Sequence, residues 1–569
     1  MKFVLSLLNN KQKKQFFVII ALTFVSMIAE TLSVVSVLPL IEVFFNDPNN
    51  VQNNKFNAYF LGKLEIDNLH FYVVILAALA FSIKGIFLTY FNFKKNDFLF
   101  NFKTFISEKL FLSYLYKPFS FHMNTNSAQL IRNLNDSGSV TVFVRTVIEL
   151  VTETLILFGL SAFLLYINYE LTILCFLFFG IIGFIFHKIT QIKASEWGEI
   201  RRYRSGLKLE DLQKGFGAIR DIKLLGKEKV FSNFFSKNLD LENVADMKNT
   251  NYMSLPKIWF EWLTLIMILL VIIYLEKIQM RSDIIVIMGL LALCAFRLVP
   301  SVVRIMNSLQ QIKFVTPAIK PFLNDVKDLE MNKISKYGQN KKKINLNKSI
   351  KLENLNFKFP NNKDLIIDNL NLEIKKNSFI GIYGESGVGK TTFVNILLGL
   401  LTAKSGKIYI DDFDISKDIN SWQNLISYIP QNVFISDDTI KNNVALGEEK
   451  ESIDMSRLNE SFKLSRIYDY IYSLPDKINT NCGELGEKLS GGQRQRIGIS
   501  RALYRNSEVL IFDEFTNFLD QQNELMILND VKNMNNKTRI IVSHNLKVLK
   551  YCDEVYEMKN KKLNKSNLN

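Results

Sequence analysis

Cysteine, histidine, glycine and proline are all scarce in this chain of 569 residues. The four cysteines (Cys175, Cys294, Cys482 and Cys552) form no C-x-x-C pair, which excludes a disulfide scaffold and a cysteine zinc site. Only 25 glycines and 10 prolines exclude collagen-like and low-complexity architectures. Because hydrophobic residues make up 48% of the sequence, a disordered chain is excluded as well. The net charge of +15 suits an anionic lipid, an anionic substrate or nucleic acid.

Long apolar runs fill the first half of the chain. A membrane-spanning helix needs about 20 mostly apolar residues, and six runs approach or exceed that length. One such run is compatible with a core helix of a soluble protein, but six in succession predict a membrane domain over residues 1–323. The runs cover residues 16–41, 71–93, 146–167, 171–186, 256–275 and 284–303.

Basic residues predict how these spans are oriented. Lys11, Lys13 and Lys14 precede the first run, which places the N-terminus in the cytoplasm by the positive-inside rule. The short connections at 168–170 and 276–283 are then external. The longer stretches at 94–145 and 187–255 are rich in Lys and Arg and look helical, so we expect internal helices that continue beyond the bilayer. Coupling helices are expected at 126–136 and 215–225, and a polar linker at 324–350.

Residues 351–569 have the pattern of a soluble α/β domain. Short apolar runs at 379–383, 509–512 and 540–542 predict buried parallel strands. The first run is followed by GESGVGKT, a match to G-x-x-x-x-G-K-[ST], and by a predicted helix at 392–400. Such a loop surrounds a phosphate with backbone N–H groups at a helix N-terminus. Its residues are Gly384, Glu385, Ser386, Gly387, Val388, Gly389, Lys390 and Thr391.

The chemistry of this loop points to ATP and Mg²⁺. Lys390 is expected to reach the β- and γ-phosphates, and the Thr391 hydroxyl to bind Mg²⁺. The run at 509–512 ends in Asp513 and Glu514. Two acids after a strand often only cap a helix, but the upstream P-loop favours a catalytic interpretation. Phosphoryl transfer needs a metal clamp, for which Asp513 is placed, and a group that orients or deprotonates the attacking water, for which Glu514 is placed.

The sequence LSGGQ, from Leu489 to Gln493, lies between the P-loop and the acidic pair. It resembles the signature of ATP-binding cassette (ABC) ATPases, and the resemblance covers residues 350–560. It implies that Ser490 and Gly492, with Gly491 and Gln493 beside them, contact the γ-phosphate of ATP held by the P-loop of a second copy. The chain is therefore expected to form a homodimer.

Further residues match the same family in the correct order along the chain. The resemblance implies that Phe359, on the first strand of this domain, stacks on adenine. It also implies that Gln431, in the segment from Tyr428 to Gln431, senses Mg²⁺ as the Q-loop glutamine. His544 matches the switch histidine that contacts the γ-phosphate, and Asp520 matches the D-loop aspartate. Thr392, next to the P-loop threonine, completes the expected ATP-binding set.

The D-loop departs from the family pattern. Where the family usually has Ser-Ala-Leu-Asp, this chain has Asn517, Phe518, Leu519 and Asp520. The departure implies that coupling between two ATP sites differs in detail. No catalytic residue of the family pattern is lost.

Charged residues inside the spans bear on the cargo. A charge at the centre of a span costs about 2.5–3.5 kcal/mol on insertion scales. Arg297 and Arg304 are seven residues apart, on one helical face, with no acid within four residues. They suit a wet cavity that receives an anion, and guanidinium groups suit phosphate. Glu30, in the first run, is a possible partner in the fold. The candidate cargo residues are Lys84, Lys257, Arg297 and Arg304.

Other charges in or near the spans have partners close in sequence. Lys257 precedes Glu261 by four residues, so an intrahelical pair is an alternative to a role in cargo binding. Arg145 precedes Glu149 and Glu153 by four and eight residues. This spacing predicts a structural ladder on one face of the helix.

A narrower resemblance comes from the segments around these cations. Residues 82–84, 256–258 and 296–301, followed by Arg304, resemble the PglK-type flippases of lipid-linked oligosaccharides. In that group basic residues at these places are thought to receive a lipid pyrophosphate. Lys84 and Lys257 stand where Arg is expected, so the charge is kept but the bidentate geometry is not.

The sequence is therefore identified as a six-span α-helical ABC exporter membrane domain fused to an α/β P-loop cassette. The expected function is ATP-driven flipping of a polyprenyl-pyrophosphate-linked oligosaccharide across a bacterial inner membrane, with the cassette in the cytoplasm. The nearest alternative is an exporter of lipid A core, peptide or drug. Cassette ATPases that act on DNA or ribosomes are disfavoured by the six spans, so no nucleic acid partner is expected. A regulated channel is disfavoured by the catalytic Glu514.

Overall fold

The computed structural model describes residues 8–37, 40, 69–167, 169–277, 284–331, 344–360, 362, 364–516 and 518–566. The chain divides into two compact units. The first comprises Met1–Lys117 and Thr125–Asn332, and the second comprises Pro118–Asn124 and Lys333–Asn569.

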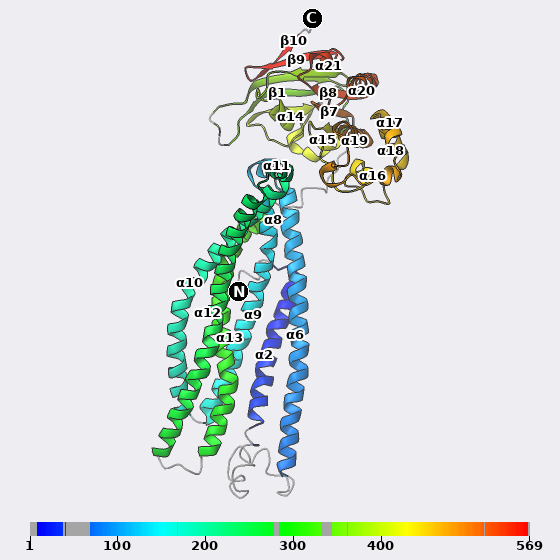
Figure 1. The fold of residues 1–569 in the computed structure, drawn as a ribbon. Coiled ribbons are helices and arrows are strands. Elements are labelled where there is room, and N and C mark those ends of the chain that lie inside the picture. The colour runs from blue at the N-terminus through cyan, green and yellow to red at the C-terminus, as the bar shows by residue number, and fades with distance from the viewer. Residues whose placement is uncertain are drawn as a thin grey trace. The chain divides into compact units, whose positions relative to one another are not determined.

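Long helices make up the first unit and run alongside one another (Figure 1). They are α2 (Asn10–Val35), α6 (Leu69–Tyr116), α9 (Ser137–Ile167), α10 (Tyr169–Gly217), α12 (Glu228–Lys277) and α13 (Ile284–Met331), with the short helices α8 (Ser127–Asn135) and α11 (Ile219–Leu225) between them. The pairs α9 and α13, α10 and α12, and α10 and α13 pack against each other along their lengths.

Apolar side chains point outward from these helices. Ile86 on α6 is 74% exposed, whereas Phe16 on α2 and Phe98 on α6 pack against each other in the interior. Large exposed apolar surfaces of this kind are rare in soluble monomers and typical of a face that meets lipid. Among the described residues, five helices are long and apolar enough to cross a membrane.

The five helices carry the first five predicted spans, so the helical membrane domain is confirmed but the count of six is not. The predicted span 284–303 forms the beginning of α13, although the side chains of 284–296 lie outside the described residues. The predicted span 16–41 differs at both ends. Helix α2 begins at Asn10, where Asn9 and Gln12 form a capping box, and it ends at Val35. The predicted run reached into residues that the structure does not describe.

The connections between spans are largely helical, as the sequence predicts. Helices α6, α10 and α12 each extend over 48 to 50 residues, about twice the length that a bilayer requires. The segments predicted as coupling helices form α8 and α11. Helix α13 continues to Met331 and strand β1 begins at Ser349, so both extend into the stretch predicted as a linker.

The second unit contains two β-sheets (Figure 1). The order in the smaller, antiparallel sheet is β2 (Ile367–Lys375), β1 (Ser349–Phe357), β4 (Ser405–Ile410) and β5 (Phe413–Asp414). The order in the larger sheet is β10 (Lys562–Ser566), β9 (Glu554–Lys559), β3 (Phe379–Tyr383), β8 (Thr538–Val542), β7 (Val509–Asp513) and β6 (Ile426–Ile429).

Burial explains why the central strands are parallel. Every residue of β7 and β8 is buried, which fits a sheet covered on both faces by helices. One face packs against α14 (Lys390–Leu397), whose Phe393 and Val394 are fully buried. The other packs against α20 (Gln521–Asn533) through Ile527 and Leu528. The predicted strands are confirmed, and the predicted helix at 392–400 begins two residues earlier and ends three earlier.

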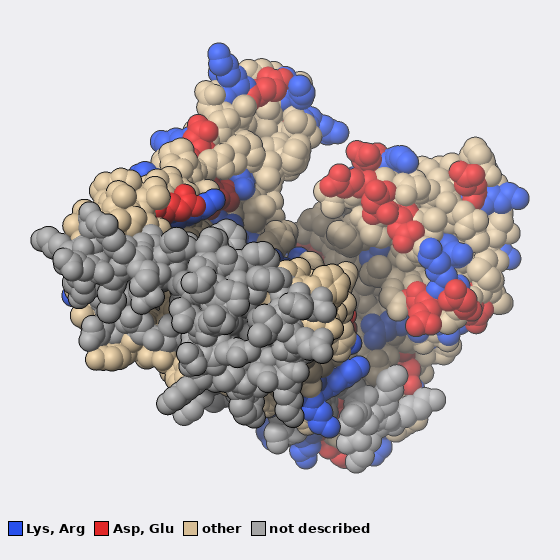
Figure 2. Space-filling view, turned by 90° about the horizontal axis from the view of Figure 1, so that it is seen from below, with Lys and Arg blue, Asp and Glu red and all other residues tan. Residues whose placement is uncertain are grey.

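The remaining helices of this unit pack either beside the large sheet or in a cluster of their own. They are α15 (Ile419–Leu425), α16 (Ile440–Val444), α17 (Met455–Leu464), α18 (Tyr468–Ser473), α19 (Gly491–Tyr504) and α21 (Leu546–Leu549), and α7 (Phe119–Asn124) is grouped with this unit. Helices α16, α17 and α19 share an apolar core that includes Phe462 and Ile497. On the face drawn in Figure 2, basic and acidic side chains are interspersed among wide uncharged areas.

Candidate nucleotide site

The carboxyl ends of four neighbouring parallel strands carry the predicted catalytic residues. The register pairs Ile382 of β3 with Val542 of β8, and Asp513 of β7 also with Val542, so these ends lie level. β6 pairs in the same direction with β7 and ends at Ile429. Ligand sites of open α/β sheets lie where the carboxyl ends of parallel strands meet. The fold therefore brings the P-loop, Gln431, Asp513, Glu514 and His544 to one edge.

The P-loop connects β3 directly to α14. Gly387 and Gly389 have φ values of +81° and +110°, which side chains other than glycine rarely adopt. A Cβ at Gly387 would meet nothing within 4 Å, whereas one at Gly389 would lie 2.9 Å from Ile366. The loop is thus open at Gly387 and tightly packed beneath Gly389. This arrangement leaves one side of the loop free for a phosphate.

Lys390 is buried and its side chain folds back onto the P-loop backbone. Its Nζ donates to the carbonyl oxygens of Gly384 at 2.8 Å and Glu385 at 2.9 Å. Burial lowers the pKa of Lys390, while Glu514 and Asp513 raise it. The ammonium group is therefore held by weak neutral acceptors, and a phosphate offers a better partner for it.

Asp513 is the buried carboxylate at the end of β7. Its Oδ2 accepts a hydrogen bond of 3.2 Å from the hydroxyl of Tyr428 on β6. Burial raises the pKa of Asp513, and the bond from Tyr428 and the charge of Lys390 lower it. Tyr428 was noted in the sequence only as part of the Q-loop segment. Nothing in its own motif indicated that its hydroxyl would contact Asp513.

Glu514 has two partners from other motifs. Its Oε2 accepts a hydrogen bond of 2.6 Å from Gln431 Nε2, and its Oε1 lies 2.8 Å from His544 Nε2. The backbone of Glu514 has a φ of +45°, a conformation costly for a residue with a side chain. Its amide donates to the carbonyl of Val542, which helps to hold this geometry.

The signature motif begins α19. Ser490 is the N-cap, and its hydroxyl accepts from the amide of Gln493 at 3.2 Å, while Gln493 Oε1 accepts from the amide of Ser490 at 2.8 Å. This reciprocal capping box fixes the start of the helix. Gln493 therefore has a structural role that the sequence interpretation did not include. Ser490 itself is exposed and keeps its hydroxyl hydrogen available.

The D-loop residues and Phe359, the predicted adenine contact, do not directly follow the carboxyl ends of the four central strands. Asp520 is the N-cap of α20 and accepts from the amide and side chain of Asn523. Phe518 is 52% exposed and lies against Gly491 and Gly492 of the signature. Phe359 lies two residues beyond the end of β1, not on the strand as predicted, and packs edge to face with Phe357.

These residues fit a nucleotide with its metal ion. The open loop at Gly387, the Lys390 ammonium and the exposed Thr391 hydroxyl are the groups that a triphosphate needs. Thr391 and Asp513 offer hydroxyl and carboxylate oxygens, which suit Mg²⁺. When bound, ATP and Mg²⁺ supply the phosphoryl group and neutralise its charge. The chain's own residues would position them, with Glu514 predicted to orient the attacking water.

Residues 367–517 match the family model described as ABC transporter. The chain therefore contains a segment that matches the cassette of ABC transporters. The lipid A-core flippases of Francisella tularensis subsp. tularensis and Ralstonia nicotianae are 36% and 35% identical to it over 187 and 185 residues. Each alignment covers 32% of this chain, and it covers 30% and 31% of the relatives, so the chain spans about a third of the length of the curated relatives that it matches.

One solved structure is similar over nearly the whole chain. The bacterial Atm1-family ABC exporter with ATP bound has a TM-score of 0.74 at 20% identity, covering 98% of this chain and 95% of the other. The chain therefore has the ABC exporter fold. The cassette's predicted P-loop and acidic residues all lie within or next to the matched family segment.

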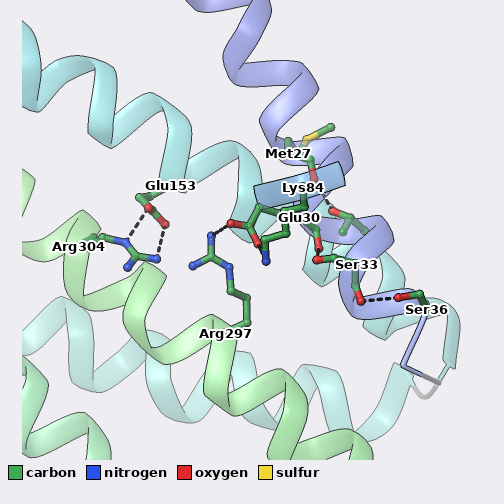
Figure 3. Close-up of polar contacts among 9 residues, drawn as sticks. Met27, Glu30, Ser33, Ser36, Lys84, Glu153, Arg297 and Arg304 are labelled. Atoms are coloured by element: carbon green, nitrogen blue, oxygen red, sulfur yellow. Dashed lines mark hydrogen bonds and ion pairs between the residues drawn. The ribbon is translucent and has the colours of Figure 1, made fainter. Parts of the chain in front are cut away.

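The membrane unit holds a second group of the predicted residues (Figure 3). Arg297 on α13 donates from Nη2 to Glu30 Oε1 on α2 at 2.7 Å. Lys84 on α6 lies 2.6 Å from Glu30 Oε2. Arg297 and Lys84, which the sequence linked only as candidate cargo residues, thus converge on one buried carboxylate that is 4% exposed. The suggested partnership with Glu30 is confirmed for Arg297.

Arg304 has a different partner. Its guanidinium makes two contacts with Glu153 on α9, at 2.6 Å to Oε1 and 3.1 Å to Oε2. The expected ladder of Arg145 with Glu149 and Glu153 is not what forms, because Glu153 pairs with Arg304 and Glu149 lies 4.0 Å from Lys95. Sequence spacing within one helix could not reveal these contacts between helices. Lys257 on α12 is exposed.

Proposed function

We propose that this protein is an ATP-driven flippase that moves a polyprenyl-pyrophosphate-linked oligosaccharide across a bacterial inner membrane. The exporter fold and the cassette support a transport ATPase. The observation that carries the cargo assignment is the placement of Lys84 on α6, which is long and apolar enough to cross a membrane, and of Arg297 and Arg304 on α13, which begins with the predicted sixth span. Cations inside membrane helices are costly and mark a functional pathway.

The charge balance of these helices supports an anionic cargo. Three cations, Lys84, Arg297 and Arg304, share two carboxylates, Glu30 and Glu153. One positive charge is left over per chain, and a homodimer would contribute two. An apolar cargo gives no reason to keep this surplus, whereas a pyrophosphate neutralises it. Arg304 is 44% exposed and is available to such a group.

The homodimer belongs to the same proposal. Ser490 caps α19 with an exposed hydroxyl, and the motif 489–493 contains no lysine, so it suits a phosphate that another P-loop holds. We expect Lys390, Thr391 and Asp513 of one copy to face Ser490 and Gly492 of the other. Gln431 and His544 would then exchange their contacts with Glu514 for contacts with water, metal and γ-phosphate.

A second candidate is flipping of lipid A core. It is favoured by the names of the relatives from Francisella and Ralstonia. Both cargos are anionic glycolipids, so the cationic residues do not separate them. The two cargos differ in the lipid part and in the sugar.

Transport in proteoliposomes tests both candidates. Purified protein should flip a fluorescent polyprenyl-pyrophosphate glycan when ATP is added, and should not do so with Glu514→Gln. The double variant Arg297→Leu/Arg304→Leu should lose flipping while basal ATP hydrolysis survives. The matched control is Lys313→Met, an exposed cation on α13 that is not among the candidate cargo residues. Flipping of lipid A core without flipping of the polyprenyl lipid would replace the first candidate with the second.

A further inference from the structure

The buried charges around Glu30 do not cancel. Lys84 from α6 and Arg297 from α13 both approach its carboxylate, and each cation is only 18% exposed at its side chain. Two cations and one carboxylate leave one positive charge in this triad. The neighbouring pair of Arg304 and Glu153 is neutral by comparison. Among Lys84, Arg297 and Arg304, the surplus charge is therefore located at Glu30.

Hydrogen-bonding capacity is also left over at the same place. The buried Nε of Arg297 has no hydrogen-bond partner among the described residues. One turn further along α13, the Ser301 hydroxyl is fully buried and has no partner there either. Unfilled donors in a low-dielectric environment are costly, and a guanidinium can serve an oxyanion with two donors at once.

Glu30 occupies the position that an incoming anion would take. Figure 3 shows the Arg297 guanidinium directed at the Glu30 carboxylate, which lies between the helix of Arg297 and that of Lys84. A carboxylate and a phosphate present similar oxygens to a guanidinium. The side chain of Glu30 thus binds both cations in the way that a cargo phosphate would.

We propose that Glu30 is a resident counter-ion, which holds Arg297 and Lys84 until a phosphate group of the cargo displaces it and which reclaims them when the cargo leaves. This inference rests on the proposed anionic cargo, and it adds a residue that sets affinity and release. Without Glu30, two unneutralised charges would stand in the membrane unit. With it, the cargo must compete for the cations, so binding is weaker and release is faster.

The test measures binding of a short-chain polyprenyl pyrophosphate to the full-length protein in nanodiscs. Glu30→Gln removes the competing charge and keeps the shape of the side chain. We expect its Kd to fall about tenfold or more, the factor that corresponds to the net worth of a hydrogen bond between charged groups. The rate of flipping at saturating cargo should fall, because release becomes slower. A neutral polyprenol should show no gain in affinity.

The matched control is Glu149→Gln. Glu149 lies on α9, four residues before Glu153, and is 4.0 Å from Lys95, so the substitution removes the same charge outside the triad. An equal gain in affinity in both variants would mean that only total charge matters, and it would overturn the proposal. Unchanged or weaker binding in a folded Glu30→Gln protein would overturn it as well.

Two further measurements keep the result interpretable. Should Glu30→Gln fail to fold, Glu30→Asp retains the charge but shortens its reach, and the Kd should still fall, by a smaller factor. No decrease of the Kd in Glu30→Asp would refute the competition between Glu30 and the cargo phosphate for the two cations.

If the wild-type protein binds the pyrophosphate but does not flip the glycan, the proposed function fails on its own. Tighter pyrophosphate binding in Glu30→Gln would then still support the role of Glu30.

Discussion

Gln431 donates a hydrogen bond of 2.6 Å to Glu514, the carboxylate that is expected to orient the attacking water. Glu514 is held on its other oxygen by His544 at 2.8 Å. All three residues follow parallel strands of one sheet, β6, β7 and β8, which explains why segments more than 80 residues apart meet here. Gln431 and His544 thus both help to hold Glu514, the residue predicted to act as general base, in place.

The first prediction concerns this base. Glu514→Gln should retain ATP binding, because Lys390 and Thr391 are unchanged, but it should lose ATP hydrolysis by a factor of about 10² or more, the usual contribution of a general base. ATPase activity and retention of labelled ATP measure the two effects. Glu557→Gln on β9 is the matched control and should hydrolyse ATP normally. Hydrolysis near the wild-type rate in Glu514→Gln would contradict the assignment.

Residues of the cassette could be assigned from sequence because they stand in contiguous motifs. The P-loop, Asp513 and Glu514 each follow an apolar strand, and parallel strands bring such ends together whatever lies between them. Contacts between elements were not predictable in this way. Neither the hydroxyl of Tyr428 on Asp513 nor the pairing of Glu153 with Arg304 leaves a periodic signal, since each depends on how two separate elements pack.

The second prediction concerns the dimer. Ser490→Arg should abolish hydrolysis, because a bulky cation at the exposed N-cap of α19 would block a facing nucleotide. Lys390→Ala should abolish it for a different reason, weak ATP binding. If each ATP site uses the P-loop of one chain and Ser490 of the other, a mixed dimer of the two variants regains one intact site. ATPase activity of co-expressed, doubly tagged dimers measures this.

Either pure variant serves as the control for that experiment. The mixed dimer should recover up to about half of the wild-type activity if the sites act independently, and less if they are coupled. Full activity in a demonstrably monomeric protein would refute the arrangement across two chains. Phe518 of the atypical D-loop packs on Gly491 and Gly492 of the signature. The activity of the mixed dimer therefore also measures how strongly the two ATP sites are coupled in this chain.

The third prediction concerns Tyr428. Its hydrogen bond stabilises the ionised form of Asp513, whose pKa burial raises. Tyr428→Phe should raise that pKa further, so that more Mg²⁺ is needed for half-maximal hydrolysis. Because Asp513 must be ionised to bind the metal, the defect should grow as the pH falls and shrink as it rises. Mg²⁺ titrations of ATPase activity at several pH values measure it.

Tyr383→Phe is the control for Tyr428→Phe. Tyr383 is a partly buried tyrosine of β3 in the same sheet, but its hydroxyl hydrogen-bonds Ser566 at 2.9 Å and has no part in holding Asp513. Its Mg²⁺ requirement should match the wild type at every pH. A Tyr428→Phe protein with an unchanged Mg²⁺ requirement at low pH would show that the bond does not support the metal site.

The last prediction concerns packing of the membrane unit. Gly198 on α10 is buried where the helix crosses α13, and an added Cβ would overlap the carbonyl oxygen of Phe314. A backbone atom cannot move aside as a side chain end can, so Gly198→Ala should force α10 and α13 apart. Overpacking of this kind typically costs about 1–3 kcal/mol. The higher helix propensity of alanine, worth about 1 kcal/mol, offsets only part of that.

Gly180→Ala is the matched control, since a Cβ there meets nothing within 4 Å and the residue lies on the same helix. In detergent, the Tm of Gly198→Ala should fall by several degrees while that of Gly180→Ala stays level or rises. An equal Tm in both variants would show that the two helices do not approach each other closely at Gly198.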